Sequence, residues 1–407
     1  MEAGLPGSCV ALTRLVGDPD VFLQDYWSVR PLHRPGADPG GFADLFSLAA
    51  VDELITTRML RQPQFRLVKD AEPVAANRFT RCVGVAMRTL SDVADPGRII
   101  EEFNSGSTIA LQALQRYWLP LTRFCRDLEL TLTHPVQANA YITPPAARGL
   151  GMHFDTHDVF VLQVAGTKRW VLHEPVVELP MPAQKHPVET DDQPLLDIVL
   201  APGDFLYVPR GFLHAATSME QVSAHLTIGI LADTWYALLQ EAAQQAVDEV
   251  AFRAPLPIGF AYDNSDFVDA VKETLQQFAT WVALLSPEQV AEKRRQRFWD
   301  GRAPILNGHF RAAAELENIN DATRLGRRPG AAMYLETDSD HIVLHLGDRK
   351  LKMPASVKGA VCIITGSNSF TVSDLSDQLD QEGRLVLVRR LVKDGALEIR
   401  DPKLSQE

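Results

Sequence analysis

The fold is decided by the segment His153-Phe154-Asp155 and by the later segment Pro209-Arg210-Gly211-Phe212-Leu213-His214, whose histidine follows the first by sixty-one residues. Side chains two positions apart on a β-strand project from the same face, so His153 and Asp155 are expected to point together into a β-barrel. A later strand can then bring His214 opposite them. Two histidines and one carboxylate on one side of a metal leave three coordination positions open, an arrangement that suits non-haem Fe(II).

Short predicted strands surround this pattern. They cover residues 136–143, 159–164, 169–173, 196–200, 205–208 and 223–230, and a further strand begins at His214. The intervening turns carry Gly or Pro, for example Ala165-Gly166-Thr167-Lys168 and Ala201-Pro202-Gly203-Asp204. About seven or eight short strands with a turn signal about every 8–12 residues are typical of a β-sandwich or barrel. We therefore expect a double-stranded β-helix with the metal at one mouth.

The order of the motifs resembles a known family. The chain contains, in sequence, Asn139-Ala140-Tyr141, His153-Phe154-Asp155, Gly166-Thr167-Lys168-Arg169-Trp170, Pro202-Gly203-Asp204 and Pro209-Arg210-Gly211-Phe212-Leu213-His214. This series resembles the JmjC/cupin-type ribosomal oxygenases, which include bacterial ribosomal-protein arginine hydroxylases and nucleolar histidine hydroxylases of animals. The segment Asp25-Tyr26-Trp27-Ser28-Val29-Arg30-Pro31-Leu32 matches the family's amino-terminal element, so the resemblance covers essentially the whole chain. The motifs specify the superfamily much more closely than the substrate.

The resemblance implies a set of site residues. It assigns iron to His153, Asp155 and His214, the distal carboxylate of 2-oxoglutarate to Lys168, further co-substrate binding to Tyr141, and the substrate side chain to Asn139 together with Ser223, which should face it from the last strand. A cation is required by the chemistry, because a five-carbon diacid that chelates iron through its keto-acid end leaves a second carboxylate deep in the barrel.

Each assignment has a structural alternative. A histidine can be satisfied inside a barrel beside a surface aspartate, and Lys168 can lie in solvent at the tip of a hairpin. The tyrosine, asparagine and serine can simply line the barrel as satisfied polar residues. Two further histidines are weaker candidates: His157 is expected near the metal or the substrate, and His225 in the core or behind the ligands.

Composition narrows the class of protein. The 407 residues predict two or three domains, and the 46% hydrophobic and 23% charged content is that of an ordinary globular protein. The four cysteines show no close pairing, which favours a reducing, cytoplasmic setting, and neither a signal peptide nor a membrane span is expected. The net charge of −12 argues against nucleic acid as the main partner and suits a basic polypeptide substrate.

The hydrophobic period indicates three parts in an α+β chain. Residues 1–231 form the predicted catalytic domain, with the barrel core at 134–231 and residues 1–135 flanking it. Residues 232–305 change to a helical period, with one apolar stripe from Trp235 to Val250 and helix starts near Asn264-Ser265-Asp266 and Ser286-Pro287. The resemblance makes this block a homodimerisation module, although its helices could instead merely cover the barrel.

Residues 306–407 are predicted to be winged-helix-like. Met333 to Leu335 and His341 to Leu346 are expected to be strands, and Ser356 to Thr365, Thr371 to Leu379 and Glu382 to Lys393 to be helices. The region carries fourteen Lys and Arg against fifteen Asp and Glu, so it lacks the basic surface of a DNA reader. We expect a structural or protein-binding role.

The implied reaction is oxidative. Fe(II), 2-oxoglutarate and O2 would together hydroxylate an Arg or His side chain. A ribosomal protein is the favoured substrate, and a ribosomally made peptide is the second choice. Demethylation of N-methyl-lysine is the enzymatic alternative. A metal-dependent cupin isomerase, which needs neither Lys168 nor oxygen, and a non-catalytic scaffold are the alternatives of another class.

Overall fold

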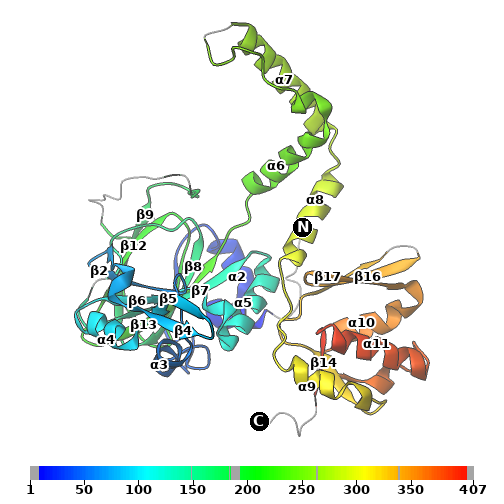
Figure 1. Ribbon diagram of the computed structural model, residues 1–407, viewed down its shortest axis with the longest axis horizontal. Coiled ribbons are helices and arrows are strands. Elements are labelled where there is room, and N and C mark those ends of the chain that lie inside the picture. Colours follow the sequence, from blue (N-terminus) through cyan, green and yellow to red (C-terminus); the bar gives the residue numbers. More distant parts are fainter. Residues whose placement is uncertain are drawn as a thin grey trace. The chain divides into compact units, whose positions relative to one another are not determined.

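The structure, a computed structural model, describes residues 9–147, 149–182, 184, 193–262, 265–337 and 340–400 (Figure 1). The chain divides between Ala232 and Asp233 into two compact units. Among the described residues, none of the helices combines the length and the apolar character needed to cross a membrane.

The first unit is built mainly of antiparallel strands. Its helices are α1 (Val10–Val16), α2 (Pro19–Asp25), α3 (Leu48–Thr57), α4 (Pro96–Asn104) and α5 (Leu119–Leu132). Its strands are β1 (Leu32–Arg34), β2 (Phe65–Lys69), β3 (Glu72–Pro73), β4 (Thr80–Val85), β5 (Arg88–Ala94), β6 (Thr108–Leu111), β7 (Val136–Thr143), β8 (Asp158–Ala165), β9 (Lys168–Pro175), β10 (Leu196–Leu200), β11 (Phe205–Val208), β12 (Phe212–Ser218) and β13 (Ser223–Ile230).

Two sheets form the barrel. The larger has the order β1-β11-β8-β13-β7-β6-β2-β3 and the smaller β10-β9-β12, while β4 and β5 pair as a separate hairpin. The predicted α+β class with an antiparallel barrel is confirmed. One expectation is corrected: strands from residues 1–135 do not merely flank the barrel, because β1, β6, β2 and β3 extend its larger sheet. These additions cover the edges of β11 and β7, which would otherwise expose unpaired backbone groups.

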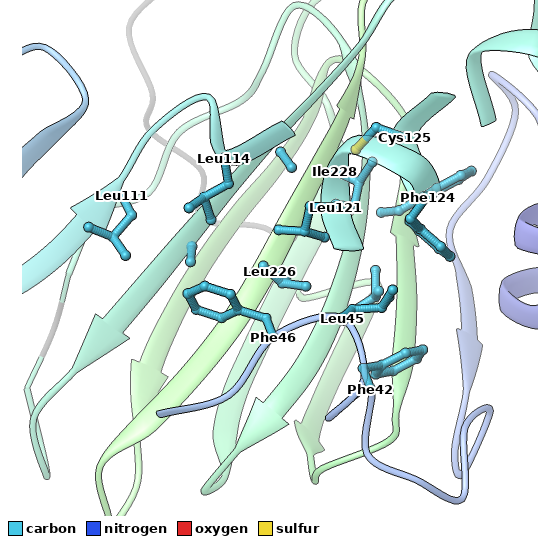
Figure 2. Close-up of a cluster of buried hydrophobic side chains, with 14 of the residues drawn as sticks. Phe42, Leu45, Phe46, Leu111, Leu114, Leu121, Phe124, Cys125, Leu226 and Ile228 are labelled. Atoms are coloured by element: carbon cyan, nitrogen blue, oxygen red, sulfur yellow. The ribbon is translucent and has the colours of Figure 1, made fainter. Parts of the chain in front are cut away.

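Alternation along β13 separates the core from the cavity. Leu226 and Ile228 point to a hydrophobic layer that includes Leu121, Phe124 and Cys125 of α5 (Figure 2). The α5 residues are spaced by three and four positions, which places them on one helical face. Leu121, Leu226 and Ile228 are completely buried, so truncating such a leucine to alanine should cost about 2–5 kcal/mol. The opposite face of β13 is therefore free to line the barrel interior.

The second unit contains the remaining elements. Its helices are α6 (Trp235–Gln244), α7 (Ser265–Ala283), α8 (Pro287–Asp300), α9 (His309–Ala314), α10 (Lys358–Gly366) and α11 (Gln381–Lys393). Its strands are β14 (Arg324–Arg327), β15 (Met333–Thr337), β16 (His341–Leu346), β17 (Arg349–Pro354), β18 (Phe370–Thr371) and β19 (Leu397–Ile399). They form two three-stranded sheets, β18-β14-β19 and β15-β16-β17.

Local predictions in this unit were met unevenly. The helix start at Ser286 is confirmed, since its hydroxyl accepts a hydrogen bond from the Gln289 amide. The long helix expected up to Val250 is wrong, because α6 ends at Gln244 and short 3-10 turns follow. The helix expected at Thr371 to Leu379 is a 3-10 turn at Val372–Leu375. Asn264 lies outside the described residues.

Candidate metal and co-substrate site

The two histidines meet across a short backbone bridge. His153 and His214 exchange both backbone hydrogen bonds, at 3.1 and 2.8 Å, and their ring centroids lie 4.3 Å apart. His214 belongs to β12, as expected. His153 and Asp155, however, do not sit on a regular strand: they precede β8, which begins at Asp158. The pairing with β12, rather than strand alternation, therefore orients His153.

The predicted ligand atoms converge. One ligand atom from each of His153, Asp155 and His214 lies within 4.8 Å of the others, and the His214 Nε2 to Asp155 Oδ2 distance is 3.7 Å. Each histidine places Nδ1 near a backbone carbonyl, that of Gly151 at 2.8 Å and that of Phe212 at 3.0 Å. If Nδ1 carries the proton, Nε2 is left as the metal-binding atom. Burial, and secondly the neighbouring His153, lowers the pKa of His214 to about 4, so His214 is neutral near pH 7.

A cavity with about 490 Å³ of empty space, part of it open to solvent, lies beside this cluster. Its lining combines the three predicted ligands with polar and aromatic residues: Thr108, Tyr141, Gly149, Leu150, His153, Asp155, Val159, Lys168, Trp170, His214, Ala216, His225 and Thr227. We call this space the inner cavity.

Lys168 lies inside the barrel. The residue is 3% exposed, and its Nζ donates to the Thr143 hydroxyl at 3.1 Å. Burial lowers the pKa of its ammonium from 10.5 to about 7. Gly166 fixes the preceding turn, because its φ is +59° and a Cβ there would lie 2.1 Å from the Val222 carbonyl oxygen. The alternative of a solvent-exposed hairpin lysine is therefore wrong.

Aromatic residues surround the lysine. Tyr141 stacks on His225 with ring centroids 5.3 Å apart, and Trp170 packs edge-on against His225 at 5.4 Å. Trp170 Nε1 and His225 Nδ1 are buried without hydrogen-bond partners among the described residues. Burial, and secondly Lys168, lowers the pKa of His225. His225 thus lines the cavity, and Trp170, which the sequence analysis did not single out, joins it because β9 alternates inward at Lys168 and Trp170.

The register of β7 and β13 places the predicted substrate residues apart. Asn139 stands opposite Thr227, whereas Ser223 stands opposite Thr143 at the other end of the pair. Ser223 is completely buried and accepts a hydrogen bond from Gln163 at 2.9 Å. The expectation that Ser223 faces Asn139 is therefore wrong. Thr227, which lies on the same face of β13 as Ser223, stands opposite Asn139 instead. The sequence alone could not identify Thr227, because its partner depends on the register between β7 and β13.

A second hollow adjoins the metal cluster. This outer cavity, with about 950 Å³ of empty space, shares Tyr141, Leu150, His153, Asp155 and Thr227 with the inner cavity. Its other lining residues are Arg66, Ala71, Asn139, Gly151, Met152 and His157. His157 therefore lies near the site, as expected. No local sequence signal marks Arg66, because β2 reaches the site only through its pairing with β6.

The chain is similar in sequence to known JmjC-domain proteins. A JmjC domain model matches residues 113–238. The bifunctional lysine-specific demethylase and histidyl-hydroxylase NO66 of Drosophila persimilis is 32% identical over 54% of this chain and 31% of that protein. Ribosomal oxygenase 1 of Gallus gallus is 30% identical over 62% of this chain and 43% of that protein, so the chain spans less than half of each relative.

A solved structure extends the likeness in fold beyond the barrel. YcfD, a ribosomal oxygenase from Escherichia coli in complex with cobalt and 2-oxoglutarate, matches with a TM-score of 0.52 at 18% identity. The match covers 95% of this chain and 99% of that chain. The likeness therefore includes the region that follows the barrel.

Proposed function

We propose that the chain, whose residues 113–238 match a JmjC domain, is a ribosomal oxygenase, an Fe(II)- and 2-oxoglutarate-dependent hydroxylase of a ribosomal protein. One observation carries the proposal. A buried lysine, Lys168, lines the same cavity as a cluster of two histidines and a carboxylate. A metal centre alone would not need a buried cation, whereas a chelating dicarboxylic acid would.

The residues present fit a divalent iron ion. His153, Asp155 and His214 would hold it, and their side of the ion would leave positions open toward the cavity. Bound iron would supply the activation of O2 with 2-oxoglutarate, which gives succinate, CO2 and one oxygen atom for the substrate. The protein itself holds the imidazoles in place through the Gly151 and Phe212 carbonyls.

The inner cavity fits 2-oxoglutarate. The Lys168 ammonium has one hydrogen-bond partner among the described residues, the Thr143 hydroxyl, and forms no ion pair with them. A carboxylate placed there would gain a charge-assisted hydrogen bond and would restore the protonated state of the lysine. Trp170 Nε1 is a further buried donor without a partner in the described part of the chain, and Tyr141 lines the same space. Tyr141 and Lys168 are therefore the proposed co-substrate residues.

We propose a basic protein as substrate, with a ribosomal protein favoured and either an arginine or a histidine side chain modified. The relatives' names and the net charge of −12 support this choice. Asn139, which lines the outer cavity, and Thr227, which lines both cavities, are the proposed contacts with the substrate side chain. The loop from Pro175 to Pro194 carries four acids that suit a cationic substrate, Glu178, Glu189, Asp191 and Asp192, of which the structure describes only Glu178.

The test is direct incubation. The protein with Fe(II) and 2-oxoglutarate is mixed with ribosomal proteins of the source organism, and peptides are mapped by mass spectrometry. We expect the mass of one added oxygen on a single Arg or His residue, coupled to succinate release. Formaldehyde with loss of a methyl group would indicate the demethylase alternative, and metal-dependent activity without O2 would indicate an isomerase.

We further propose that the chain dimerises through its helices. The assignment is 1–231 to the catalytic domain, 232–305 to dimerisation and 306–407 to a winged-helix-like domain. Helix α7 has no buried residue, although its apolar side chains recur at heptad spacing. The exposed members are Val268, Val271, Leu275 and Val282, between 39% and 67% exposed. A second copy of the chain would cover this stripe.

The winged-helix-like region is proposed to serve structure or protein contacts, without direct DNA binding. A cytoplasmic location is proposed because all four cysteines are free thiols, as in a reducing compartment, and because the favoured substrate is a ribosomal protein.

A further inference from the structure

We propose that Arg66 makes the outer cavity select an uncharged side chain that accepts a hydrogen bond, such as a neutral imidazole, and reject guanidinium and methylated ammonium groups. This inference rests on the proposed function and decides between its two candidate substrate residues. Arg66 would act as a specificity-determining residue, because it lies in the cavity beside the metal cluster and not among the metal ligands.

Sheet register places Arg66 over the site. Arg66 of β2 pairs with Ala110 of β6, which pairs with Tyr141 of β7, so the three side chains share one face of the sheet. Ala110 is small and completely buried, which leaves room for the long arginine to extend toward Tyr141. Burial raises the pKa of Tyr141, and the neighbouring Arg66 charge opposes that rise. Arg66 Nε is itself buried without a partner among the described residues.

The polar groups around Arg66 are poorly suited to a cation. Among the described lining residues of the outer cavity, Asp155 is the only carboxylate, and it belongs to the metal cluster. The Asn139 Oδ1 atom already accepts the Ala113 amide at 3.0 Å, so Asn139 offers a substrate its N–H donors. Guanidinium and ammonium groups are donors only, whereas a neutral imidazole presents one acceptor nitrogen.

The balance of charges in the loaded site also favours an uncharged substrate side chain. With the site loaded, the negative charges of 2-oxoglutarate and Asp155 would match those of Fe(II) and protonated Lys168. Arg66 would then be the uncompensated charge facing the substrate, among the lining residues that the structure describes. A second cation beside it would be repelled in a partly desolvated space.

The test measures binding without turnover. The full chain is loaded with Mn(II) and 2-oxoglutarate under nitrogen, above the imidazole pKa. Paramagnetic broadening of NMR signals is then compared for capped histidine, capped arginine and capped dimethyl-lysine. We expect capped histidine to be favoured at least about tenfold, equivalent to about 1.4 kcal/mol. Arg66→Met should reduce this preference, and Arg66→Glu should reverse it toward arginine.

A matched variant controls for overall charge. Arg88→Glu makes the same charge change at an exposed position of β5, outside the lining of both cavities, and should leave the preference intact. Equal broadening of the three probes by the wild-type protein, including none at all, would overturn the proposal, as would an unchanged preference in a folded Arg66→Glu variant. Failure of the ribosomal-protein assay would count against the proposed oxygenase function. Failure of this binding test would count against the selectivity assigned to Arg66.

Discussion

At the scale of single residues, the site depends on polar atoms that folding leaves available. The Nδ1 atoms of His153 and His214 lie against backbone carbonyls, and their Nε2 atoms are left to converge with the Asp155 carboxylate. Lys168 keeps hydrogen-bonding capacity beyond its contact with Thr143. These groups are costly to bury without ligands, which is the physical reason to expect a metal and a diacid here.

The first prediction concerns the metal cluster. His153→Ala and Asp155→Ala should each lose bound iron and turnover, because a divalent ion would retain only two of three protein ligands. Both variants should stay within about 1 kcal/mol of the wild-type stability, since the site lies at the barrel mouth and the Asp155 side chain is 30% exposed. Metal analysis, turnover and thermal melting check this. His341→Ala, a change at an exposed histidine elsewhere, should keep its iron, and full activity of either cluster variant would remove the ligand assignment.

The second prediction concerns the co-substrate. Lys168→Ala should raise the KM for 2-oxoglutarate about ten- to a hundredfold, since a charge-assisted hydrogen bond contributes about 1.5–3 kcal/mol. Iron affinity should change little. Arg169→Ala is the matched control, because that neighbouring cation is exposed and pairs with Asp197. An unchanged KM in the Lys168 variant would instead support a metal-dependent isomerase.

The third prediction follows from the pKa of Lys168, which burial lowers from 10.5 to about 7. Between these values the unfolded chain holds a proton that the folded, metal-free chain lacks. The free energy of unfolding should therefore rise as the pH increases through this window, by up to roughly 5 kcal/mol, and should not change on this account below it. Denaturant titrations of wild type and Lys168→Met check the effect. A difference between the two proteins that does not vary with pH would contradict it.

At the scale of elements, alternation gives each strand two roles. One face of β13 packs Leu226 and Ile228 into the core, and the other presents His225 and Thr227 to the cavities. Helix α7 lacks this balance, because four apolar members of its stripe stay exposed within the described chain: Val268, Val271, Leu275 and Val282. An unburied stripe of this length is typical of an interface between subunits.

The fourth prediction concerns that stripe. The wild-type chain should sediment at micromolar concentration as a species of twice the 45.1 kDa chain mass. Leu275→Asp should shift it toward the monomer, because a carboxylate would be buried without a partner. Ile100→Asp, at a 52% exposed apolar position of α4, introduces the same carboxylate outside the proposed dimerisation block of residues 232–305 and should leave the dimer intact. A wild-type protein found only at 45.1 kDa would refute the dimer.

At the scale of the whole molecule, the distribution of charge favours a polypeptide partner over a nucleic acid. The chain carries a net charge of −12, and residues 306–407 are close to neutral. The arginines of α11 engage groups of the protein itself: Arg384 pairs with Asp321 at 2.7 Å and Arg390 with Asp394 at 2.6 Å. Arg389 donates to the carbonyls of Glu317 and Ile319. Arg389 also pairs with the Glu317 carboxylate at 3.8 Å, so all three arginines form ion pairs within the protein.

The fifth prediction is that the full chain does not bind duplex DNA appreciably at physiological salt. Phosphate neutralisation supplies most non-specific affinity, and paired arginines are poorly available for it. A gel-shift titration checks this. Arg384→Ala should leave the result unchanged. A salt-sensitive, submicromolar complex would move the favoured substrate from the ribosome to chromosome-bound proteins.

Local sequence patterns predict four strands of the barrel and the chemistry of the site. Turn residues and a period of two act locally, so β7, β10, β11 and β13 begin and end where the pattern predicts. The spacing of His153, Asp155 and His214 was likewise enough to expect them together, whereas Lys168 was assigned to the same site by the family resemblance. Only a few residue types can bind a metal or supply a buried positive charge. Such residues can therefore be recognised in the sequence before the fold is known.

Only the tertiary structure decided which side chains share a face across strands. It brought Arg66 beside Tyr141 through Ala110, put Thr227 rather than Ser223 opposite Asn139, and oriented His153 from outside any regular strand. The physical reason is register. A strand's own sequence sets which residues alternate, but its neighbours and their offset depend on packing between segments distant in the chain, and a shift of one residue changes every cross-strand partner.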